Sequence, residues 1–470
     1  MLLVLYEVCL LHILNTQSTL PNTSMESWRQ IHLQIWCFFA HIFVFLHFSF
    51  FVDYHRQIRN SPTSAMIRIS LRDLKQLSAR AKAVVADARE QMLAPDSIKR
   101  APVFSLSDVE YATSKTLKQI RTALRSGKDA LGPLPQGRTK DEVADKASEL
   151  DGRGQKKYFT AEEFHRICKF MSPERFRPDG APGIVMTVCN FKGGVTKSTS
   201  AACIAQALSS LGYARTLIVD LDPQGSLSNL FGFLQVLDVE ASQTALPVLS
   251  GETDSLKPSV RETYWPGIHI VPSCPALQIA EANFRGDIEK FGTAVMMRMA
   301  SALNEMRNEY DFIIFDTPPS LNNLTLHALM NSDGVIMPLP PSNLDLASAS
   351  MFWDMFTDSF KALGVVDEDT EVFSFMRVFS PKMEKTRSCR NVLSWIKSTY
   401  GGYFSDVAIP KSAAVSNASD AFGTVFDGQV DSSLKRSPSH MAVKTAYMEL
   451  SQEIVTETME LWKQAANTKQ

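Results

Sequence analysis

The stretch that decides the fold reads Asn190-Phe191-Lys192-Gly193-Gly194-Val195-Thr196-Lys197-Ser198-Thr199. It follows the apolar run Gly183–Val188, which predicts a buried strand. Glycines let the backbone turn its N–H groups toward an anion, and a helix that starts after them adds its positive N-terminal end. A strand, a glycine turn and Lys-Ser in this order indicate a phosphate-binding loop.

Two side chains at the end of this loop have the chemistry of a nucleotide site. Lys197 would reach the β- and γ-phosphates, and the Ser198 hydroxyl would bind Mg²⁺. The common loop pattern has glycine where this chain has Phe191 and Thr196, so the plain motif is absent. A second lysine, Lys192, opens the run instead. The residues expected around the phosphates are Lys192, Gly193, Gly194, Val195, Thr196, Lys197, Ser198 and Thr199.

Two further segments place carboxylates at the ends of predicted parallel strands. The β-rich run Thr216–Val219 is followed by Asp220 and Asp222, and the apolar run Asp311–Phe315 is followed by Asp316. Open α/β sheets build their ligand crevices at this edge. One aspartate at a strand end can equally be a helix cap or a turn residue. The phosphate loop and these two segments, in the right order, favour a nucleotide site.

The Lys-Gly-Gly-x-x-Lys-Ser run from Lys192 to Ser198 resembles the deviant Walker A loop of the ParA/MinD ATPases. The resemblance implies that Lys192 crosses a dimer interface, so that two ATP molecules lie between two monomers. It also implies that Asp222 orients or deprotonates the attacking water, that Asp220 supports the site and that Asp316 lies near Mg²⁺, through water. The residues expected to act in catalysis are thus Lys192, Lys197, Asp222 and Asp220, with Ser198 and Asp316 at the metal.

The same resemblance implies a cellular task. Family members are slow ATPases whose dimers bind DNA nonspecifically, and a centromere-binding ParB protein stimulates hydrolysis. The chain is therefore expected to be a DNA segregation protein that is cytoplasmic and nucleoid-associated. Its expected partners are ATP, Mg²⁺, DNA, a ParB-like protein and a second copy of the chain.

Charge is unevenly placed along the 470 residues, although the net charge is only −2. Residues 66–180 carry 23 Lys and Arg against 16 Asp and Glu, whereas residues 181–470 carry 22 against 31. A basic part joined to an acidic part suggests that the basic part meets nucleic acid. The seven cysteines are scattered without a C-x-x-C pair, which is typical of reduced thiols in an intracellular protein.

Residues 1–65 form an atypical apolar extension. Leu33–Val52 has no formal charge and is long enough to span a membrane, with Arg56 and Arg59 after it. Met1–Leu14 could be a signal-like segment, but it lacks a basic start. We favour a third interpretation, in which the natural start is Met66, because the resembled family begins close to that point. No membrane contact is expected for residues 66–470.

Residues 66–180 are predicted to be a helical DNA-binding domain. A helix capped by Ser105 and a break at Thr113 lead into Lys115–Ser126, where apolar residues recur at helical spacing. Lys115, Lys118, Arg121 and Arg125 lie on its other sides. A packed face and a basic face are typical of a helix-turn-helix recognition helix, and equally of an amphipathic helix with a solvated face. Residues 127–154 could hold a wing or a flexible linker, and a further capped helix is predicted near 160.

Residues 181–470 are predicted to be a ParA-type P-loop ATPase domain with a mostly parallel, doubly wound sheet. Further strands are expected at Ile268–Val271, Gly334–Leu339 and Val372–Phe379, and a packing helix at Ala442–Lys463. The whole chain is expected to be an α/β P-loop NTPase preceded by a winged helix-turn-helix-like domain, as in the larger plasmid-partition ParA proteins, which also repress their own operon. Nonspecific DNA contacts are expected from Lys382, Lys385, Arg387, Arg390, Lys435 and Arg436, against the alternative of a solvated loop.

Three other functions remain open from the sequence. A small-molecule ligase of the same superfamily would share the phosphate loop but has no use for a basic helical domain. A reductase of the nitrogenase iron-protein type needs paired cluster cysteines, and Cys274 and Cys389 have no clear motif. A transcriptional repressor with nucleotide as an allosteric ligand is hardly separable from the partition ATPase, because the resembled class does both.

Overall fold

The computed structural model describes residues 70–93, 99–138, 158–235, 237–362, 364, 369–420, 422–427 and 437–468. The chain divides into two compact units, residues 1–76 and 77–470, and the described part of the first is the start of helix α3 (Leu71–Leu93). The predicted extension 1–65, with Leu33–Val52, and the cations Lys435 and Arg436 lie outside the described residues. None of the described helices has the length and hydropathy that a membrane span requires.

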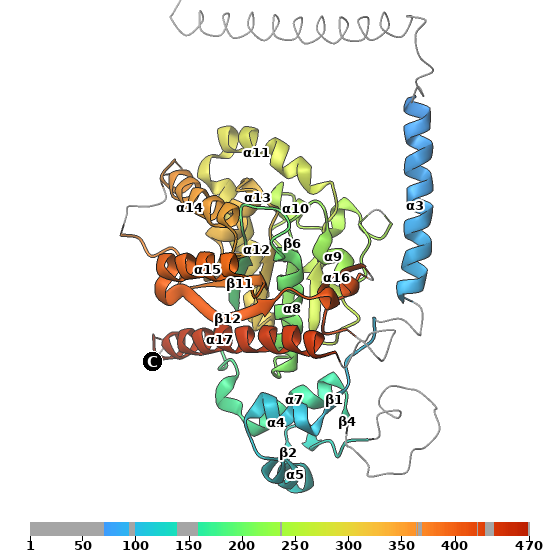
Figure 1. Ribbon diagram of the computed structural model, residues 1–470, viewed down its shortest axis with the longest axis vertical. Coiled ribbons are helices and arrows are strands. Elements are labelled where there is room, and N and C mark those ends of the chain that lie inside the picture. The colour runs from blue at the N-terminus through green and yellow to red at the C-terminus, as the bar shows by residue number, and fades with distance from the viewer. Residues whose placement is uncertain are drawn as a thin grey trace, which may run out of the picture. The chain divides into compact units, whose positions relative to one another are not determined.

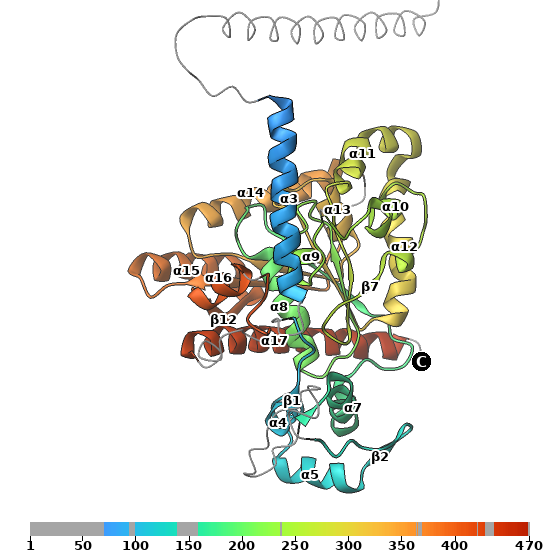
Figure 2. The same cartoon turned by 90° about the vertical axis from the view of Figure 1, so that its right-hand side faces the viewer.

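An eight-stranded sheet forms the centre of the second unit. In sheet order its strands are β12 (Phe404–Pro410), β11 (Phe375–Met383), β10 (Gly334–Pro338), β5 (Ile184–Val188), β9 (Phe312–Asp316), β6 (Thr216–Asp220), β8 (Ile268–Val271) and β7 (Arg261–Glu262). All neighbours are parallel except the edge pair β7–β8. Figure 2 shows β12 and β7 on opposite sides of the sheet. The central strands are buried along their whole length, which explains why they read as continuous apolar runs.

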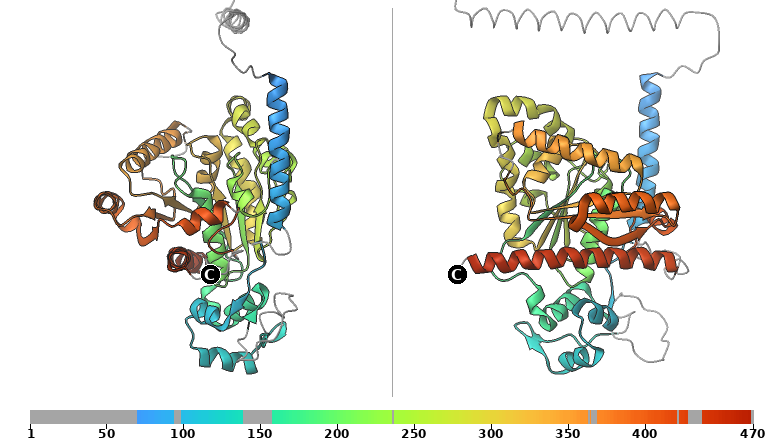
Figure 3. Two further views of the ribbon diagram at one scale, coloured as in Figure 1. Left: turned by 45° about the vertical axis from the view of Figure 1, so that its right-hand side comes forward. Right: turned by 60° about the vertical axis from the view of Figure 1, so that its left-hand side comes forward.

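Helices cover both faces of this sheet, as the layers in Figures 1 and 3 show. One apolar core joins the sheet to α8 (Lys197–Ser210), α9 (Ser226–Leu230) and α17 (Pro438–Thr468), with α16 (Ala413–Asp420) beside α17. Two further cores join the other face to α10 (Leu246–Leu249), α11 (Leu277–Phe291), α12 (Met297–Glu309), α13 (Asn323–Met330), α14 (Asn343–Ala362) and α15 (Arg387–Tyr400). The predicted doubly wound P-loop fold is confirmed.

A small helical region precedes the sheet and has its own core. It contains β1 (Phe104–Ser105), α4 (Leu106–Thr113), α5 (Leu117–Ser126), β2 (Lys128–Asp129), β3 (Gly132–Pro133), β4 (Tyr158–Phe159) and α7 (Ala161–Met171). Ser105 caps α4 and Thr116 caps α5, each through a capping box. Between the helices, Ser114 adopts the left-handed conformation, with φ of 55°. The antiparallel pair β2–β3 follows α5 directly, in the position of a wing.

Two predicted boundaries that involve expected DNA-contact residues differ from the structure, and one strand was not predicted. The helix expected at Lys115–Ser126 begins at Leu117, because the side chain of Thr116 caps it. The strand expected at Val372–Phe379 spans Phe375–Met383, so Lys382 belongs to a strand and not to the loop after it. Strand β12 was not predicted, because only Ser405 and Ile409 of its residues are buried and it contains no long apolar run.

Candidate nucleotide-binding site

The phosphate loop lies between the end of β5 and the start of α8, at the carboxyl edge of the parallel sheet. Asn190 fixes its first half. Its Nδ2 donates to the carbonyl of Pro338 at 2.8 Å, and its Oδ1 accepts from the backbone N–H of Lys192 at 3.0 Å. The Thr317 hydroxyl donates to the Val188 carbonyl at 3.0 Å, which ties the neighbouring strand β9 to the start of the loop.

Two residues of the loop have left-handed backbone conformations. Gly194 has a φ of 73° and Thr196 a φ of 75°. Threonine is branched at Cβ, so this conformation costs on the order of 1–2 kcal/mol more than it does for glycine. The common loop pattern has glycine at the position of Thr196, and the backbone here still takes the shape that glycine favours. Strain of this kind collects at functional sites, where the surroundings enforce it.

Lys197 is buried, and its ammonium group lies near two carboxylates. The residue is 7% exposed, and its Nζ donates to the backbone carbonyl of Lys192 at 3.2 Å. Burial lowers the pKa of the Lys197 ammonium, while the negative charges of Asp316 and Asp222 oppose that shift. The structure therefore brings together Lys197, Asp222 and Asp316, which lie on three different segments of the chain.

Asp316 has the features expected of a cation ligand. Both of its carboxylate oxygens are buried and have no hydrogen bond of ordinary distance and angle from the described residues, although the Ser198 hydroxyl lies close enough to act on the carboxylate. Burial and the negative charge of Asp220 raise its pKa well above the usual value, whereas the Ser198 hydroxyl and Lys197 lower it. Because Mg²⁺ prefers hydroxyl, carboxylate and water oxygens, Ser198 and Asp316 form a donor set that fits this ion.

Asp220 and Asp222 differ in how much of each carboxylate is engaged. Asp220 accepts from the backbone N–H of Asp222 at 3.1 Å, and from the N–H and hydroxyl of Ser228 at 2.8 and 2.7 Å. Its burial raises its pKa to about 7, against those hydrogen bonds. Asp222 is 8% exposed, and its Oδ1 accepts from the backbone N–H of Gln224 at 2.9 Å. Asp220 thus positions the strand end, while Asp222 faces the crevice of Lys197.

Lys192 is partly exposed and contacts a residue that the sequence analysis did not single out. Its Nζ is 2.8 Å from Oδ1 of Asp345, and the two side chains are 39% and 9% exposed. Asp345 lies in the first turn of α14, where it also accepts from the Ser342 hydroxyl. It follows the carboxyl end of β10, so the rule that placed the other aspartates at strand ends could have found it.

The residues expected to contact DNA fall into separate groups. Lys118, Arg121 and Arg125 are exposed on α5, whereas Ile120 and Leu124 are buried, so one face is packed and the other is basic. Lys385, Arg387 and Arg390 are exposed around the start of α15. Lys382 is different, because its Nζ donates to the Gly194 carbonyl in the phosphate loop at 2.7 Å.

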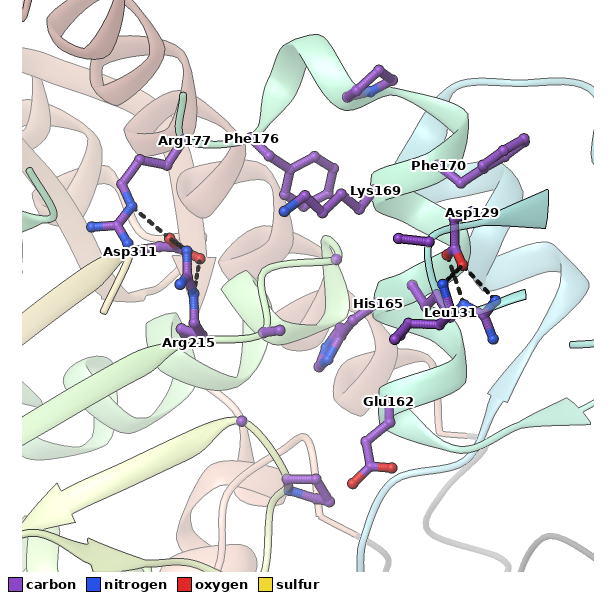
Figure 4. A pocket seen from close by; sticks show the side chains of 17 residues that line it. Asp129, Leu131, Glu162, His165, Lys169, Phe170, Phe176, Arg177, Arg215 and Asp311 are labelled. Atoms are coloured by element: carbon purple, nitrogen blue, oxygen red, sulfur yellow. Dashed lines mark hydrogen bonds and ion pairs between the residues drawn. The ribbon is translucent and has the colours of Figure 1, made fainter. Parts of the chain in front are cut away.

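A second hollow lies at the opposite edge of the sheet. This cavity of about 630 Å³ is lined by α7, by the β2–β3 turn and by residues that precede strands β6, β8 and β9 (Figure 4). At one side of the cavity, Asp311 forms ion pairs with Arg177 at 3.0 Å and with Arg215 at 2.7 Å. Asp129 at the other side pairs with Arg166 at 2.6 Å. Since phosphates bind where the strands end, this cavity is separate from the nucleotide site.

Comparison with known proteins agrees with this geometry. Residues 183–363 match the family model described as an AAA domain. A protein named "Putative replication protein A" from Rhizobium rhizogenes is 30% identical over 293 residues, which cover 58% of this chain and 71% of the relative. Protein SopA from Escherichia coli strain K12 is 26% identical over 288 residues, which cover 60% of this chain and 73% of SopA.

A solved structure described as a partition protein has the same fold, with a TM-score of 0.51 at 20% sequence identity. The match covers 72% of this chain and 91% of that structure. With its two-lysine phosphate loop and these relatives, the chain belongs to the ParA/MinD family of P-loop ATPases.

Proposed function

We propose that this protein is a DNA-partition ATPase whose ATP-bound form is a dimer. The observation that carries the proposal is the difference between the two loop lysines. Lys197 is buried against Asp316 and Asp222, as suits a residue that binds phosphates within its own subunit. Lys192 is 39% exposed and bound to Asp345, and it can reach a second subunit.

The chemistry assigned to each residue follows from its surroundings. Bound Mg²⁺ would neutralise charge on the β- and γ-phosphates, and Ser198 and Asp316 would hold it. Lys197 and the loop N–H groups would stabilise negative charge on the transferred phosphoryl group. Asp222 would orient the attacking water and accept its proton, with Oδ1 fixed by the N–H of Gln224.

The proposed partition cycle is inferred from the resemblance to the ParA/MinD family. We propose that the ATP dimer binds DNA nonspecifically, that a ParB-like partner stimulates slow hydrolysis, and that hydrolysis releases the dimer from the nucleoid. The exposed cations Lys385, Arg387 and Arg390 support a phosphate-backbone contact on this part of the surface.

The two lysines give the test. Lys197→Ala should abolish nucleotide binding or hydrolysis, because the buried cation of the crevice is lost. Lys192→Ala should keep much of the monomer's ATP binding but fail to dimerise with a nonhydrolysable ATP analogue, as measured by sedimentation. Lys385→Ala, which removes an exposed lysine outside the loop, is the matched control. A Lys192→Ala protein that dimerises normally would refute the proposed dimer.

A second function, repression of its own operon, is favoured by the geometry of α4 and α5. The two capped helices, the tight turn at Ser114 and the basic face of α5 have the form of a DNA-reading unit. Replacing Lys118, Arg121 and Arg125 together by Ala should abolish binding to a DNA fragment from upstream of the gene and leave ATP hydrolysis unchanged. Unaltered binding to that fragment would assign α5 to a solvated surface.

A further inference from the structure

The end of strand β11 has an irregularity that directs one side chain toward the phosphate loop. Ser380 pairs with Ala408 and Met383 with Pro410, so three steps along β11 match two along β12. Pro381 and Lys382 lie within this bulge, and Lys382 has a φ of 56°. Bulges occur next to active sites, where they redirect a side chain. A left-handed lysine persists only where the surrounding structure enforces it.

The Lys382 side chain ends on the phosphate loop itself. Its Nζ donates to the carbonyl of Gly194 at 2.7 Å, across a sequence separation of 188 residues. An ammonium-to-carbonyl hydrogen bond is charge-assisted and therefore stronger than a neutral one. Gly194 lies between Lys192 and Lys197, and it too has a left-handed conformation. A strained lysine thus contacts a glycine that adopts the same left-handed conformation without strain.

Because the peptide bond is planar, the contact between Lys382 and the Gly194 carbonyl also orients the N–H of Val195. In a trans peptide the C=O of one residue and the N–H of the next point in opposite directions. Holding the Gly194 carbonyl toward Lys382 therefore turns the N–H of Val195 away from Lys382. Phosphate loops bind their anion through such N–H groups. The orientation of one expected donor is then set by a side chain from another strand.

We propose that Lys382 is a positioning residue of the nucleotide site, which fixes the Gly194–Val195 peptide with its N–H available to a phosphate. This differs from the expectation that Lys382 contacts DNA together with Lys385, Arg387 and Arg390. Because Lys382 acts on nucleotide affinity, the proposal holds whether or not the protein partitions DNA.

Lys382→Asn tests the proposal, because asparagine tolerates a positive φ but cannot reach the loop with an ammonium group. Lys290→Asn is the matched control, since Lys290 is an exposed lysine at the end of α11 that belongs neither to the phosphate loop nor to the expected DNA contacts. With a fluorescent ADP analogue and no DNA, we expect about five- to tenfold weaker binding for Lys382→Asn, as for the loss of one charge-assisted hydrogen bond at a partly exposed site. Binding by Lys290→Asn should be unchanged.

Two further measurements separate positioning from other roles. Hydrogen exchange of the amides of residues 190–197 should be faster in nucleotide-free Lys382→Asn than in the control. With a saturating nonhydrolysable ATP analogue, the slope of log DNA affinity against log salt should stay unchanged, whereas a lost phosphate contact would flatten it by ~0.9. Lys382→Gly, which relieves the backbone, should repeat the nucleotide defect if Lys382→Asn folds poorly. ADP binding within twofold of wild type in both variants, or a flattened salt slope, would overturn the proposal.

Discussion

Acidification should loosen the contact between α7 and α8 through one histidine. His165 on α7 is buried, and its Nε2 lies 3.0 Å from the carbonyl and 3.1 Å from the hydroxyl oxygen of Ser209 on α8. Burial lowers its pKa from 6.5 to about 4. The folded protein therefore keeps His165 neutral at pH values where the unfolded chain already binds a proton.

The sign and size of the effect follow from these two pKa values. The stabilisation is complete above pH 6.5 and is lost as the pH falls toward 4. Between about pH 7.5 and about pH 5, a group with these values lowers the free energy of unfolding by about 2 kcal/mol. His327 has the same lowered pKa of about 4, also through burial, and should contribute a similar loss that the His165 variant retains.

Urea unfolding of wild type and His165→Gln at the two pH values measures the effect. All other titrating groups are shared, so the difference between the two pH-dependent losses isolates His165. Wild type should lose about 2 kcal/mol more than the variant. Equal losses in the two proteins would show that His165 is protonated without cost, and would refute the assignment of a buried neutral imidazole at this contact.

Two further predictions concern the crevice and the buried charges. Asp222→Ala should lower the rate of phosphate release by a factor on the order of 100 while the ATP-bound dimer persists, because a general base contributes at least that much. Asp222→Asn, which can keep the contact with the N–H of Gln224, should be equally slow. A wild-type rate of hydrolysis would move the catalytic role to Asp220 or to another residue. Lys99→Met should lower the free energy of unfolding by about 3–5 kcal/mol in urea melts, because Lys99 and Asp427 form an ion pair with side chains 0% and 2% exposed. The control is the partly exposed pair of Arg89 and Asp238, whose side chains are 37% and 17% exposed. Arg89→Met should cost about 0–1 kcal/mol, and similar costs in both variants would contradict the burial argument.

The sequence predicted the central part of the fold well because that part is defined locally. Buried parallel strands read as apolar runs, so β5, β6, β9 and β10 were found within one or two residues. Strand β12 is half exposed, and its mixed composition hid it. The end of β11 was missed for a related reason, since Pro381 and Lys382 read as the end of a strand while the sheet continues through a bulge.

The candidate site likewise has residues that the sequence predicts and residues that it does not. Lys197, Ser198 and the strand-end aspartates are recognisable from spacing, because the motif is short and each residue follows its own strand. Asp345 and Lys382 are brought to the loop by the order of the strands, β11 beside β10 and β10 beside β5. The hydrophobic periodicity within one segment does not indicate the order of the strands in the sheet. Lys382 therefore needs the fold before it can be assigned, whereas Asp345 could have been proposed from its place after strand β10.

The contact between Lys192 and Asp345 has an energetic implication for the proposed dimer. Asp345 is only 9% exposed, so its carboxylate is expensive to leave without a cation. If Lys192 moves to the nucleotide of a second subunit, the Asp345 carboxylate must find another donor. A nucleoside triphosphate offers Lys192 more negative charge than a diphosphate does. The same competition would therefore oppose the dimer with ADP and permit it with ATP, so that Asp345 makes dimerisation depend on the γ-phosphate.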